Sequence, residues 1–403
     1  MINKDIEPKI FERLINSAKL TKYKNKCEFW DINGSSQKLA YLTHNYFRYF
    51  GKFPSTVAKK LIEEYTSKEE DVVVDTMVGS GTTLVESALA KRKAIGFDVN
   101  PFSILLSKVK VTKINTKKLD LAFEEIKSRF NNINQKKRSD LIPDMRNIDH
   151  WFDKKVQKEL ANIKSSVLKL KDEKVRDFFL VNFAAILRRA SCAGSQTGRI
   201  FHDKNWEYRN TYELFEKHYN LMRNRMEELN DLKFPKISAK LSNAKKVSLE
   251  NNSSKLVICH PPYYNLYKFS HTNKFELVWL DFDTTKVTSQ EVFEGFKLGN
   301  VEKHTKYLDD MYEVIDEMHR IMSKEGTGAL MLGDSIVQKK RVIIAERIVK
   351  YLEKKRIPLK KIILRKPRFA EASYAASQRR NGENLGHDLT DFIIIFGKSN
   401  GKP

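Results

Sequence analysis

The stretch Val72-Val73-Val74-Asp75-Thr76-Met77-Val78-Gly79-Ser80-Gly81-Thr82-Thr83 decides the fold of this chain. Three β-branched residues that run into a glycine-containing turn are typical of a buried strand at its end. Thr82 or Thr83 can cap a helix with an apolar face, and residues 94–97 form a second apolar run that ends in Asp98. Strand, turn, helix and strand make a βαβ unit, which predicts an α/β fold with a Rossmann-like, doubly wound sheet.

The rest of the chain divides into strand-rich and helix-rich parts. Four more apolar runs predict strands at 256–258, 329–332, 362–364 and 392–396. Residues 111–237 instead show helical periodicity, with a buried helix expected near 175–190, and a further core helix is expected at 307–322. We therefore predict an N-terminal extension at 1–40, an α/β domain made of 41–110 and 238–403, and an inserted helical region at 111–237.

The composition restricts the class of protein. Of 403 residues, 41% are apolar and 31% charged, which is typical of a globular chain. No apolar run approaches the roughly 20 residues of a membrane-spanning helix, and the first residues do not resemble a secretory signal. Cys27, Cys192 and Cys259 have neither CxxC spacing nor a disulfide pattern. We expect a reduced, cytoplasmic protein without a metal site.

The net charge favours a polyanionic partner. The chain carries 74 Lys and Arg against 51 Asp and Glu, a formal charge of +23. Bound cationic side chains displace counterions from phosphates, so this balance is typical of nucleic-acid-binding proteins. A Lys-rich, solvated surface would give the same number, so the charge alone leaves the partner open.

The glycine turn lacks the features of a phosphate-binding loop. Leu84 stands where a dinucleotide fingerprint has its third glycine, and the chain contains no P-loop motif. Asp98, at the end of the second strand, is placed to accept both hydroxyls of a ribose. Asp75, beside the first strand, suits a positively charged group. A nucleoside with a cationic amino-acid tail and no phosphates is S-adenosylmethionine, although an ordinary βαβ turn would also fit the pattern.

A second motif follows the predicted strand at 256–258, where the chain reads Cys259-His260-Pro261-Pro262-Tyr263-Tyr264. Prolines cannot continue a central strand and make a rigid exit at its carboxyl end, where open α/β sheets bind ligands. A fixed carbonyl there can accept a hydrogen bond from an exocyclic amine, and the next ring can stack on a base. The alternative is a packed Pro-Pro turn, which is less common beside a glycine turn of this kind.

Together, these motifs resemble the DNA amino-methyltransferase family. Residues 75–83 are similar to its cofactor loop (D-P-F-x-G-S-G-T-T), and His260–Tyr263 to its catalytic tetrapeptide ([DNS]-P-P-[YFW]). Residues 44–54 resemble the segment that closes over the methionine end of the cofactor. The resemblance implies a methyltransferase sheet, S-adenosylmethionine as cofactor, and a helical insert where one permutation of the family has its target-recognition region. It implies these cofactor-binding residues: Phe50, Lys52, Phe53, Pro54, Asp75, Thr76, Gly79, Ser80, Gly81, Thr82, Thr83, Asp98 and Asn100.

The implied catalytic residues are His260, Pro261, Pro262 and Tyr263. His260 departs from the family pattern, in which Asp or Asn accompanies adenine-N6 and Ser cytosine-N4. A neutral imidazole can accept an amine hydrogen, or His260 can brace the loop while a proline carbonyl is the sole acceptor. The tail at 262–268 slightly favours the cytosine-N4 branch. The expected reaction is direct transfer to the amine of a flipped base, with Tyr263 stacking on it. Thr76 in place of the family proline is expected to be harmless.

A basic segment near the C-terminus predicts contacts with DNA. Between Lys339 and Arg380 the chain has 15 Lys and Arg and 3 Asp and Glu, although each cluster alone fits a solvated face. The predicted DNA-binding residues are Arg188, Arg189, Arg199, Lys339, Lys340, Arg341, Arg365, Lys366, Arg368, Arg379 and Arg380. The first three, together with the loop at 191–199, are expected either to reach bases or to close the active site.

The sequence thus predicts a site-specific DNA amino-methyltransferase in restriction-modification or a related defence system. The expected partners are double-stranded DNA and a cognate restriction endonuclease. Three alternatives stay open: an RNA methyltransferase of the guanine-N2 type, a protein-glutamine methyltransferase, which the charge disfavours, and a non-catalytic DNA-binding protein of the same fold. The recognition sequence and oligomeric state do not follow from these residues.

Overall fold

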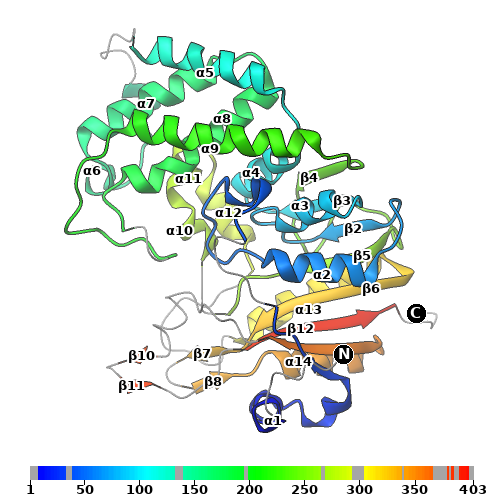
Figure 1. Ribbon diagram of the computed structural model, residues 1–403. Helices are drawn as coiled ribbons and strands as arrows, with labels where there is room; N and C mark the ends of the chain where they lie inside the picture. The colour runs from blue at the N-terminus through cyan, green and yellow to red at the C-terminus, as the bar shows by residue number, and fades with distance from the viewer. Residues whose placement is uncertain are drawn as a thin grey trace.

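The computed structural model describes residues 8–32, 39–131, 139–194, 198–264, 268–292, 304–337, 340–365, 379–380, 383–384 and 390–398. An eight-stranded sheet crosses the molecule in the order β1-β9-β12-β6-β5-β2-β3-β4 (Figure 1). Its strands are β1 (Cys27–Phe29), β2 (Val72–Asp75), β3 (Lys93–Asp98), β4 (Ile237–Leu241), β5 (Ser254–Cys259), β6 (Met322–Gly333), β9 (Leu359–Arg365) and β12 (Asp391–Gly397). Two short antiparallel pairs lie outside it: β7 (Ser335–Val337) with β8 (Lys340–Val342), and β10 (Arg379–Arg380) with β11 (Glu383–Asn384).

The sheet is doubly wound, as predicted. The chain moves outward from β2 through β3 to β4, then returns to the other side of β2 with β5 and β6, and all of these neighbours are parallel. β12 is antiparallel to both β6 and β9. The strand order therefore reverses between β2 and β5, and this is the point at which open α/β sheets bind ligands, at the carboxyl ends of the strands.

Helices cover both faces of the sheet. One face packs against α2 (Ser55–Tyr65), α3 (Thr82–Leu89) and α4 (Pro101–Val111), and the other against α1 (Pro8–Ser17), α13 (His304–Ile321) and α14 (Ala345–Lys354). Successive residues of β2 separate the two cores, because Val73 belongs to the first and Val74 to the second. A parallel strand buried on both faces needs a continuous apolar run, which is why Val72–Val74 could be recognised in the sequence.

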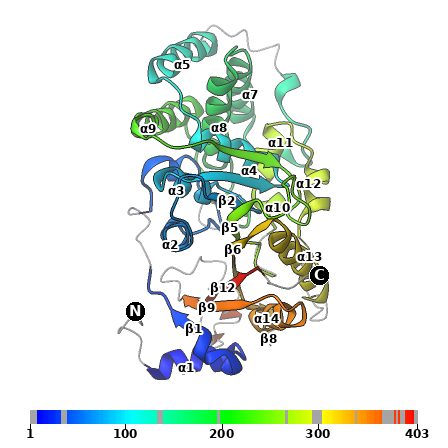
Figure 2. The same ribbon diagram turned by 90° about the vertical axis from the view of Figure 1, so that its right-hand side faces the viewer.

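The predicted helical insert is confirmed. Its helices are α5 (Thr116–Asn131), α6 (Ile148–Trp151), α7 (Lys154–Leu168), α8 (Glu173–Ala190) and α9 (Thr211–Asp231). Aromatic rings hold them together: those of Phe123 on α5 and Tyr219 on α9 stack with centroids 4.2 Å apart. Figures 1 and 2 show α5, α7 and α9 beyond the β4 end of the sheet, while α1 lies at the opposite end. The domain boundaries themselves stay a prediction.

The described part of the N-terminal extension packs with the sheet. β1 pairs in parallel with β9, and Leu14 and Ile15 of α1 are buried in the same core as α14. The remaining described helices are short. Three are 3-10 helices: η1 (Thr21–Lys26), η2 (Leu42–Asn45) and η4 (Ser139–Leu141). Three are α-helices: α10 (Phe269–Thr272), α11 (Lys274–Trp279) and α12 (Thr284–Gln290). Among the described helices, none has the length and apolar character needed to cross a membrane.

Candidate active site

The glycine turn, residues 75–83, connects β2 to α3 in a conformation that needs its glycines. Gly79 and Gly81 have φ of +46° and +77°, a region that side chains disfavour. A Cβ on Gly81 would lie 3.0 Å from the Cα of Ser107, so the close packing of α4 also excludes a larger residue. The backbone of the turn can therefore approach a ligand closely.

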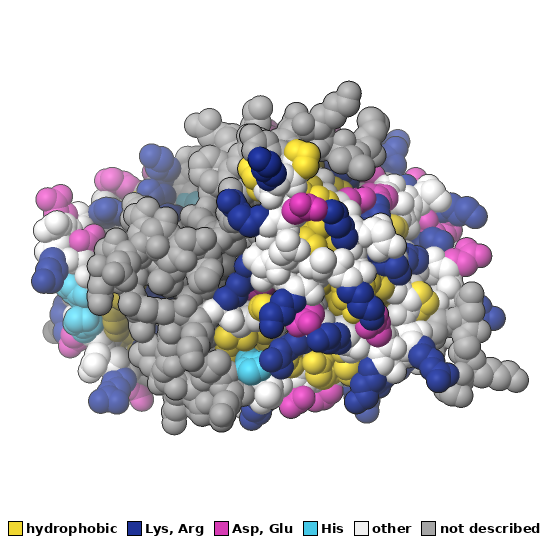
Figure 3. Space-filling view, turned by 90° about the horizontal axis from the view of Figure 1, so that it is seen from below, with side chains coloured by type: hydrophobic (Ala, Val, Ile, Leu, Met, Phe, Trp, Pro, Cys, Tyr) yellow, Lys and Arg dark blue, Asp and Glu magenta, His cyan; other side chains and the backbone are white. Residues whose placement is uncertain are grey.

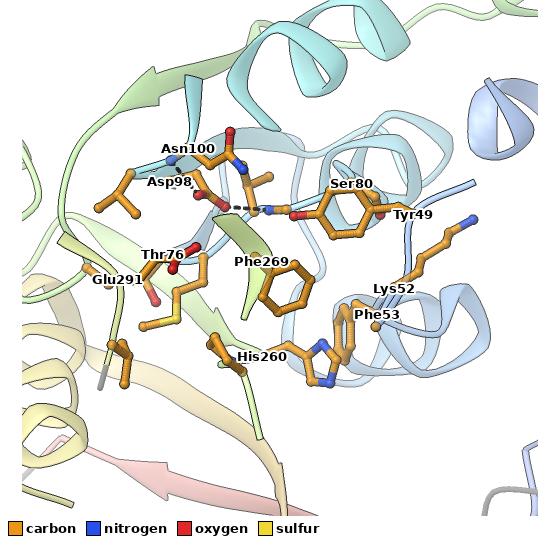
Figure 4. Close-up of a pocket in the computed structure, with 18 of the residues that line it drawn as sticks. Tyr49, Lys52, Phe53, Thr76, Ser80, Asp98, Asn100, His260, Phe269 and Glu291 are labelled. Carbon is orange, nitrogen blue, oxygen red and sulfur yellow. Dashed lines mark hydrogen bonds between the residues drawn. The ribbon is translucent and has the colours of Figure 1, made fainter. Parts of the chain in front are cut away.

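Asp98 is held by backbone N–H groups at the end of β3. The Gly79 nitrogen donates to Oδ2 and the Asn100 nitrogen to Oδ1, both at 2.9 Å. Burial raises the pKa of Asp98 to about 6, although these hydrogen bonds oppose the shift. The carboxylate thus bridges the glycine turn and the start of α4, and it faces the space between them (Figure 4).

Asp75 supports the turn from within. Its carboxylate accepts hydrogen bonds from the hydroxyl of Thr83 and from the Met77 nitrogen, the latter at 3.1 Å. The side chain is buried, and burial raises its pKa to about 7. The turn is also fixed by Lys110 of α4, whose Nζ donates to the Ser80 carbonyl at 2.7 Å. Asp75 therefore shapes the turn and does not line the adjoining cavity.

A cavity of about 720 Å³, open solvent included, lies at the reversal of strand order. It contains both Asp98 and His260, as a shared site for cofactor and base requires (Figure 4). The predicted site residues in its lining are Lys52, Phe53, Thr76, Gly79, Ser80, Asp98, Asn100, His260 and Pro262. The others are outside the lining: Phe50, Pro54, Asp75, Gly81, Thr82, Thr83, Pro261 and Tyr263.

The sequence did not single out several residues of this lining. Tyr49 donates to or accepts from the Ser103 hydroxyl at 3.0 Å, and its ring stacks on that of Phe269, with centroids 5.7 Å apart. Glu291 also faces the cavity and accepts a hydrogen bond of 2.8 Å from the Ser270 hydroxyl. Burial raises the pKa of Glu291 to about 7. Tyr49 lies within the predicted segment 44–54, whereas no motif marks Phe269 or Glu291.

The diproline corner, residues 260–263, follows β5 directly. The His260 imidazole lies 5.2 Å from the Phe53 ring, centroid to centroid, and 5.4 Å from the Tyr263 ring, which meets it edge on. Burial lowers the pKa of His260 to about 3, and the nearby Arg365 guanidinium adds to this effect. The imidazole is therefore neutral at physiological pH and can accept a hydrogen bond.

Distant side chains hold this corner in place. The Tyr263 hydroxyl donates to Asp391 Oδ1 at 3.0 Å, and the other oxygen of Asp391 lies 2.6 Å from Arg365 Nη1. Tyr307 of α13 donates to the Pro262 carbonyl at 2.9 Å. The Tyr263 ring also packs on Gly333, where a Cβ would approach it to 2.8 Å. Tyr263 is therefore tightly positioned beside His260.

The lining suits a cationic ligand better than a polyphosphate. Asp98 and Glu291 are acidic, and the Nζ of the lining residue Lys52 donates to the His44 carbonyl at 3.1 Å. The Nδ2 of Asn100 is buried without a hydrogen-bond partner among the described residues, so it can donate to a ligand. No group of three or more potential metal-ligating side chains occurs in the described part of the chain. An adenosine with a sulfonium-bearing tail fits this set of groups.

Some predicted DNA-binding residues have structural partners. Arg365 is buried and paired with Asp391, so it does not form part of an exposed phosphate-binding face. Arg341 lies 2.8 Å from buried Asp334, and Arg188 donates to the carbonyls of Gly194 and Arg199 at 3.0 and 2.8 Å. Because these partners already bind the guanidinium groups, the structure favours a positioning role for all three.

The other predicted DNA-binding residues divide into two groups. Arg189 and Arg199 are exposed. Lys339, Lys366 and Arg368 lie outside the described residues, and only the backbone is described for Lys340 in β8 and for Arg379 and Arg380 in β10. On the face that carries α1 and α14, Lys and Arg alternate with Asp and Glu (Figure 3), and pairs such as Lys22–Glu353 and Lys355–Asp316 occur there. That face is mixed in charge.

Comparison with protein families and curated sequences gives consistent results. The N6_N4_Mtase family model, described as "DNA methylase", matches residues 4–108. "Type II methyltransferase M.MvaI" of Kocuria varians is 24% identical over 321 residues, 71% of this chain and 69% of that protein. M.BsoBI of Geobacillus stearothermophilus is 34% identical over 21% of this chain and 17% of that protein. M.MjaII of Methanocaldococcus jannaschii is 23% identical over 41% of this chain and 32% of that protein. Both also carry the name type II methyltransferase.

Comparison with solved structures gives distant matches. Geranyl diphosphate C-methyltransferase from Streptomyces coelicolor A3(2) aligns over 86% of this chain and 79% of its own, with a TM-score of 0.37 and 7% identity. The rRNA methyltransferase AviRa from Streptomyces viridochromogenes aligns over 90% of this chain and 93% of its own, with a TM-score of 0.33 and 9% identity. The description of the fold therefore rests on the strand order and the packing of the sheet.

Proposed function

Since the chain belongs to the DNA amino-methyltransferase family, we propose that it transfers a methyl group from S-adenosylmethionine to an exocyclic amine of a base in DNA. The observation that supports this most strongly is the shared cavity, in which the acid at the end of β3 and the imidazole of the diproline corner face one space. A methyl donor and its acceptor must meet in such a space.

We propose that the glycine turn and its surroundings bind the cofactor. S-adenosylmethionine, when bound, supplies a methyl group on a sulfonium that an amine nitrogen can attack. Asp98 would accept hydrogen bonds from the ribose hydroxyls, and Asn100 Nδ2 would donate to the adenosine part. Tyr49 and Phe53 supply aromatic surface, and the acidity of Asp98 and Glu291 favours a cationic tail.

The diproline corner would hold the target base. An exocyclic amine is a poor nucleophile because its lone pair is delocalised into the ring. In this proposal the neutral His260 imidazole accepts one amine hydrogen and a proline carbonyl of the corner accepts the other, which aims the nitrogen lone pair at the methyl group. The low pKa of His260 suits an acceptor that orients the amine, and the proton that the methylated nitrogen loses would pass to water and not remain on the imidazole. Orientation of this kind supplies much of the rate of such a reaction.

The base must leave the duplex to reach this cavity. Phe53, whose ring lies beside His260 in Figure 4, is available to stack on it. Tyr263 lies outside the lining and is fixed by Asp391, so we assign it to the support of His260 and replace it by Phe53 as the stacking ring. Base stacking of this kind contributes ~1–3 kcal/mol.

We propose cytosine-N4 over adenine-N6 as the target, on the basis of the sequence at 262–268. We also propose a role in restriction-modification beside a cognate endonuclease, because the curated relatives carry the name type II methyltransferase. Protection of plasmid DNA from a panel of restriction enzymes, after expression of the protein in the plasmid host, would identify the recognition sequence.

One assay tests the function directly. The protein is incubated with methyl-labelled S-adenosylmethionine and plasmid DNA, the DNA is digested to nucleosides, and the labelled base is identified by mass spectrometry. N4-methylcytosine is expected, whereas N6-methyladenine would overturn the choice of base only. Label on RNA alone would favour the guanine-N2 type of enzyme. Cofactor binding without any transfer would favour a non-catalytic DNA-binding protein.

A further inference from the structure

A second cavity opens beside the active site, between the helical insert and the short helices α10 to α12. It encloses about 1230 Å³, open solvent included. One wall is formed by Trp151 and the loop at 198–201, and the other by residues 268–288. We call it the basic groove. Its full lining is Trp151, Gly198, Arg199, Ile200, Phe201, Lys268, Ser270, His271, Thr272, Lys274, Phe275, Val278, Thr284 and Thr288.

The groove combines cationic, hydroxyl and aromatic groups. Arg199, Lys268 and Lys274 are basic, and four Ser and Thr residues add hydroxyl groups. None of the described lining residues is Asp or Glu. Phe201 is 57% exposed, an unusual state for so large an apolar ring. Cations and hydroxyls suit phosphates, and an exposed ring suits the face of a base.

Hydrogen bonds tie the described residues around Arg199 and Phe201 to the helical insert. The Gly194 nitrogen donates to the Phe201 carbonyl at 2.9 Å, and the Cys192 nitrogen to the Trp151 carbonyl at 2.7 Å. The Arg188 guanidinium binds the carbonyls of Gly194 and Arg199 from the side of α8. Residues restrained by such bonds lose less conformational entropy when a ligand binds.

The basic groove adjoins the active site through α10. Phe269 lines the active-site cavity, while its neighbours in the chain, Lys268 and Ser270, line the groove. Ser270 also donates to Glu291, which faces the active site. A polymer with one unit in the active site would therefore place the units next to it in the groove.

We propose that the basic groove binds the DNA strand that carries the target base, immediately beside that base. Arg199, Lys268 and Lys274 contact its phosphates, the hydroxyl groups add hydrogen bonds to the same backbone, and Phe201 stacks on a base or sugar. The proposal rests on the proposed function, since it assumes a base in the active site. It assigns a DNA-contacting role to Lys268, the last residue of the tail at 262–268, and to Phe201 and Lys274, which no motif marks.

The test measures DNA affinity separately from catalysis. A short fluorescein-labelled DNA duplex is titrated with the full-length protein at several salt concentrations, and fluorescence anisotropy reports binding. Arg199→Gln combined with Lys274→Gln should weaken binding about tenfold and lower the salt slope by about two. Phe201→Ala should weaken binding about fivefold or more with an unchanged slope.

A matched control removes the same charge elsewhere. Lys117 and Lys127 lie on α5, far from α10 in both ribbon views (Figures 1 and 2). Lys117→Gln combined with Lys127→Gln should change DNA affinity by less than about twofold, because exposed charges beyond a Debye length contribute little. Binding of S-adenosylhomocysteine, measured by calorimetry, should be equal in all variants and verifies their fold.

The outcomes distinguish this inference from the proposed function. Groove variants that bind DNA as well as the wild type, while the wild type methylates DNA, would overturn the groove alone. Absence of DNA methylation by the wild type would overturn the function, whereas a loss of affinity in the groove variants would still support a nucleic-acid groove. Stronger dependence on these residues for RNA than for DNA would contradict the assignment to DNA.

A second measurement needs only the wild type. Oligonucleotides with 5-iododeoxyuridine at varied positions are cross-linked to the protein by ultraviolet light, and the modified peptides are identified by mass spectrometry. Cross-links to Trp151 or Phe201 would support the proposal. Cross-links confined to peptides outside the groove would overturn it.

Discussion

The glycine turn and the diproline corner lie on opposite sides of one cavity, but they are held in different ways. The turn is fixed mainly by nearby parts of the chain. Asp98 accepts a hydrogen bond from the nitrogen of Gly79, 19 residues before it, and Asp75 accepts one from the nitrogen of Met77, two residues after it. The corner is fixed by distant side chains, because Tyr307 is 45 residues from Pro262 and Asp391 is 128 residues from Tyr263.

This difference has a consequence for function. Most contacts of the turn lie within one βαβ unit and the adjoining α4, which supplies Lys110 and Ser107, so its shape depends chiefly on the local fold. The corner forms only when β6, β9 and β12 are in place, since Gly333, Arg365 and Asp391 stand side by side in their register. Substitutions at the turn should therefore affect cofactor binding and stability, and those at the corner the transfer step.

The largest effect is expected at His260. His260→Ala removes the proposed acceptor, and kcat should fall at least about 100-fold, because a lost oriented hydrogen-bond partner has effects of this size. Cofactor affinity should stay within about threefold of the wild type. Steady-state methylation of plasmid DNA measures the first quantity and calorimetry the second.

His260→Asn restores a side-chain acceptor and should recover part of the rate. His319→Ala, at a half-buried position of α13 outside the cavity lining, is the control and should leave kcat unchanged. A His260→Ala protein with the full rate would leave the proline carbonyl as the sole acceptor and would remove His260 from the proposed mechanism.

The next effect is expected at the turn, where Asp98→Asn should weaken cofactor binding roughly 10- to 100-fold. Hydrogen bonds to a charged group contribute about 1.5–3 kcal/mol each. Asp71→Asn is a matched control, since Asp71 also accepts two backbone N–H bonds, from Ser67 and Lys68, but near the start of β2. It should leave cofactor affinity unchanged. Equal losses in both variants would indicate a general structural effect.

The pH dependence of cofactor binding sharpens this test. In the free protein the pKa of Asp98 is raised to about 6, so the carboxylate gains a proton as the pH falls through that value and stops accepting hydrogen bonds. Affinity should therefore decline below about pH 6 in the wild type and be much flatter in Asp98→Asn. Asp75 and Glu291, with pKa values near 7, titrate in the same region. Glu291→Gln isolates the contribution of Glu291, the member of that pair that lines the cavity.

The sequence predicted those parts of the molecule that depend on local patterns. Val72–Val74 and residues 392–396 were recognised as strands because both faces of the sheet bury them. β1 was not predicted, because three half-buried residues carry no period. β4 was also missed: it is an edge strand with a mixed pattern of burial.

The same rule explains the site. Asp98 and the glycines were found because their roles follow from their position in a βαβ unit. Glu291 and Phe269 were missed because they enter the cavity from short helices that no motif marks. Arg365 was interpreted as a phosphate ligand because it stands in a basic run, but the register of β9 against β12 places it opposite Asp391, inside the protein.

A smaller effect, on stability, is expected at Gly81. In Gly81→Ala the alanine would have to adopt a φ of +77°, and its Cβ would lie 3.0 Å from Ser107. Because both are strained, the free energy of unfolding should fall by about 1–3 kcal/mol. Gly194→Ala is the control, because its Cβ would meet nothing nearer than 3.9 Å. Urea unfolding monitored by circular dichroism measures both. Equal stability of the two variants would show that the turn adapts to a side chain.

The smallest effect separates positioning from packing at the corner. Tyr263→Phe keeps the ring that packs on Gly333 and removes only the hydrogen bond to Asp391, which is worth about 1 kcal/mol. If that bond aligns Tyr263 against His260, kcat should fall about fivefold with little change in the KM for cofactor. Tyr351→Phe removes a similar bond, 2.9 Å long, to Asp316 between α14 and α13. If both variants lose similar stability but only Tyr263→Phe loses kcat, the hydroxyl of Tyr263 is a positioning group. If kcat is unchanged in both variants, the role of the Tyr263 hydroxyl is limited to packing.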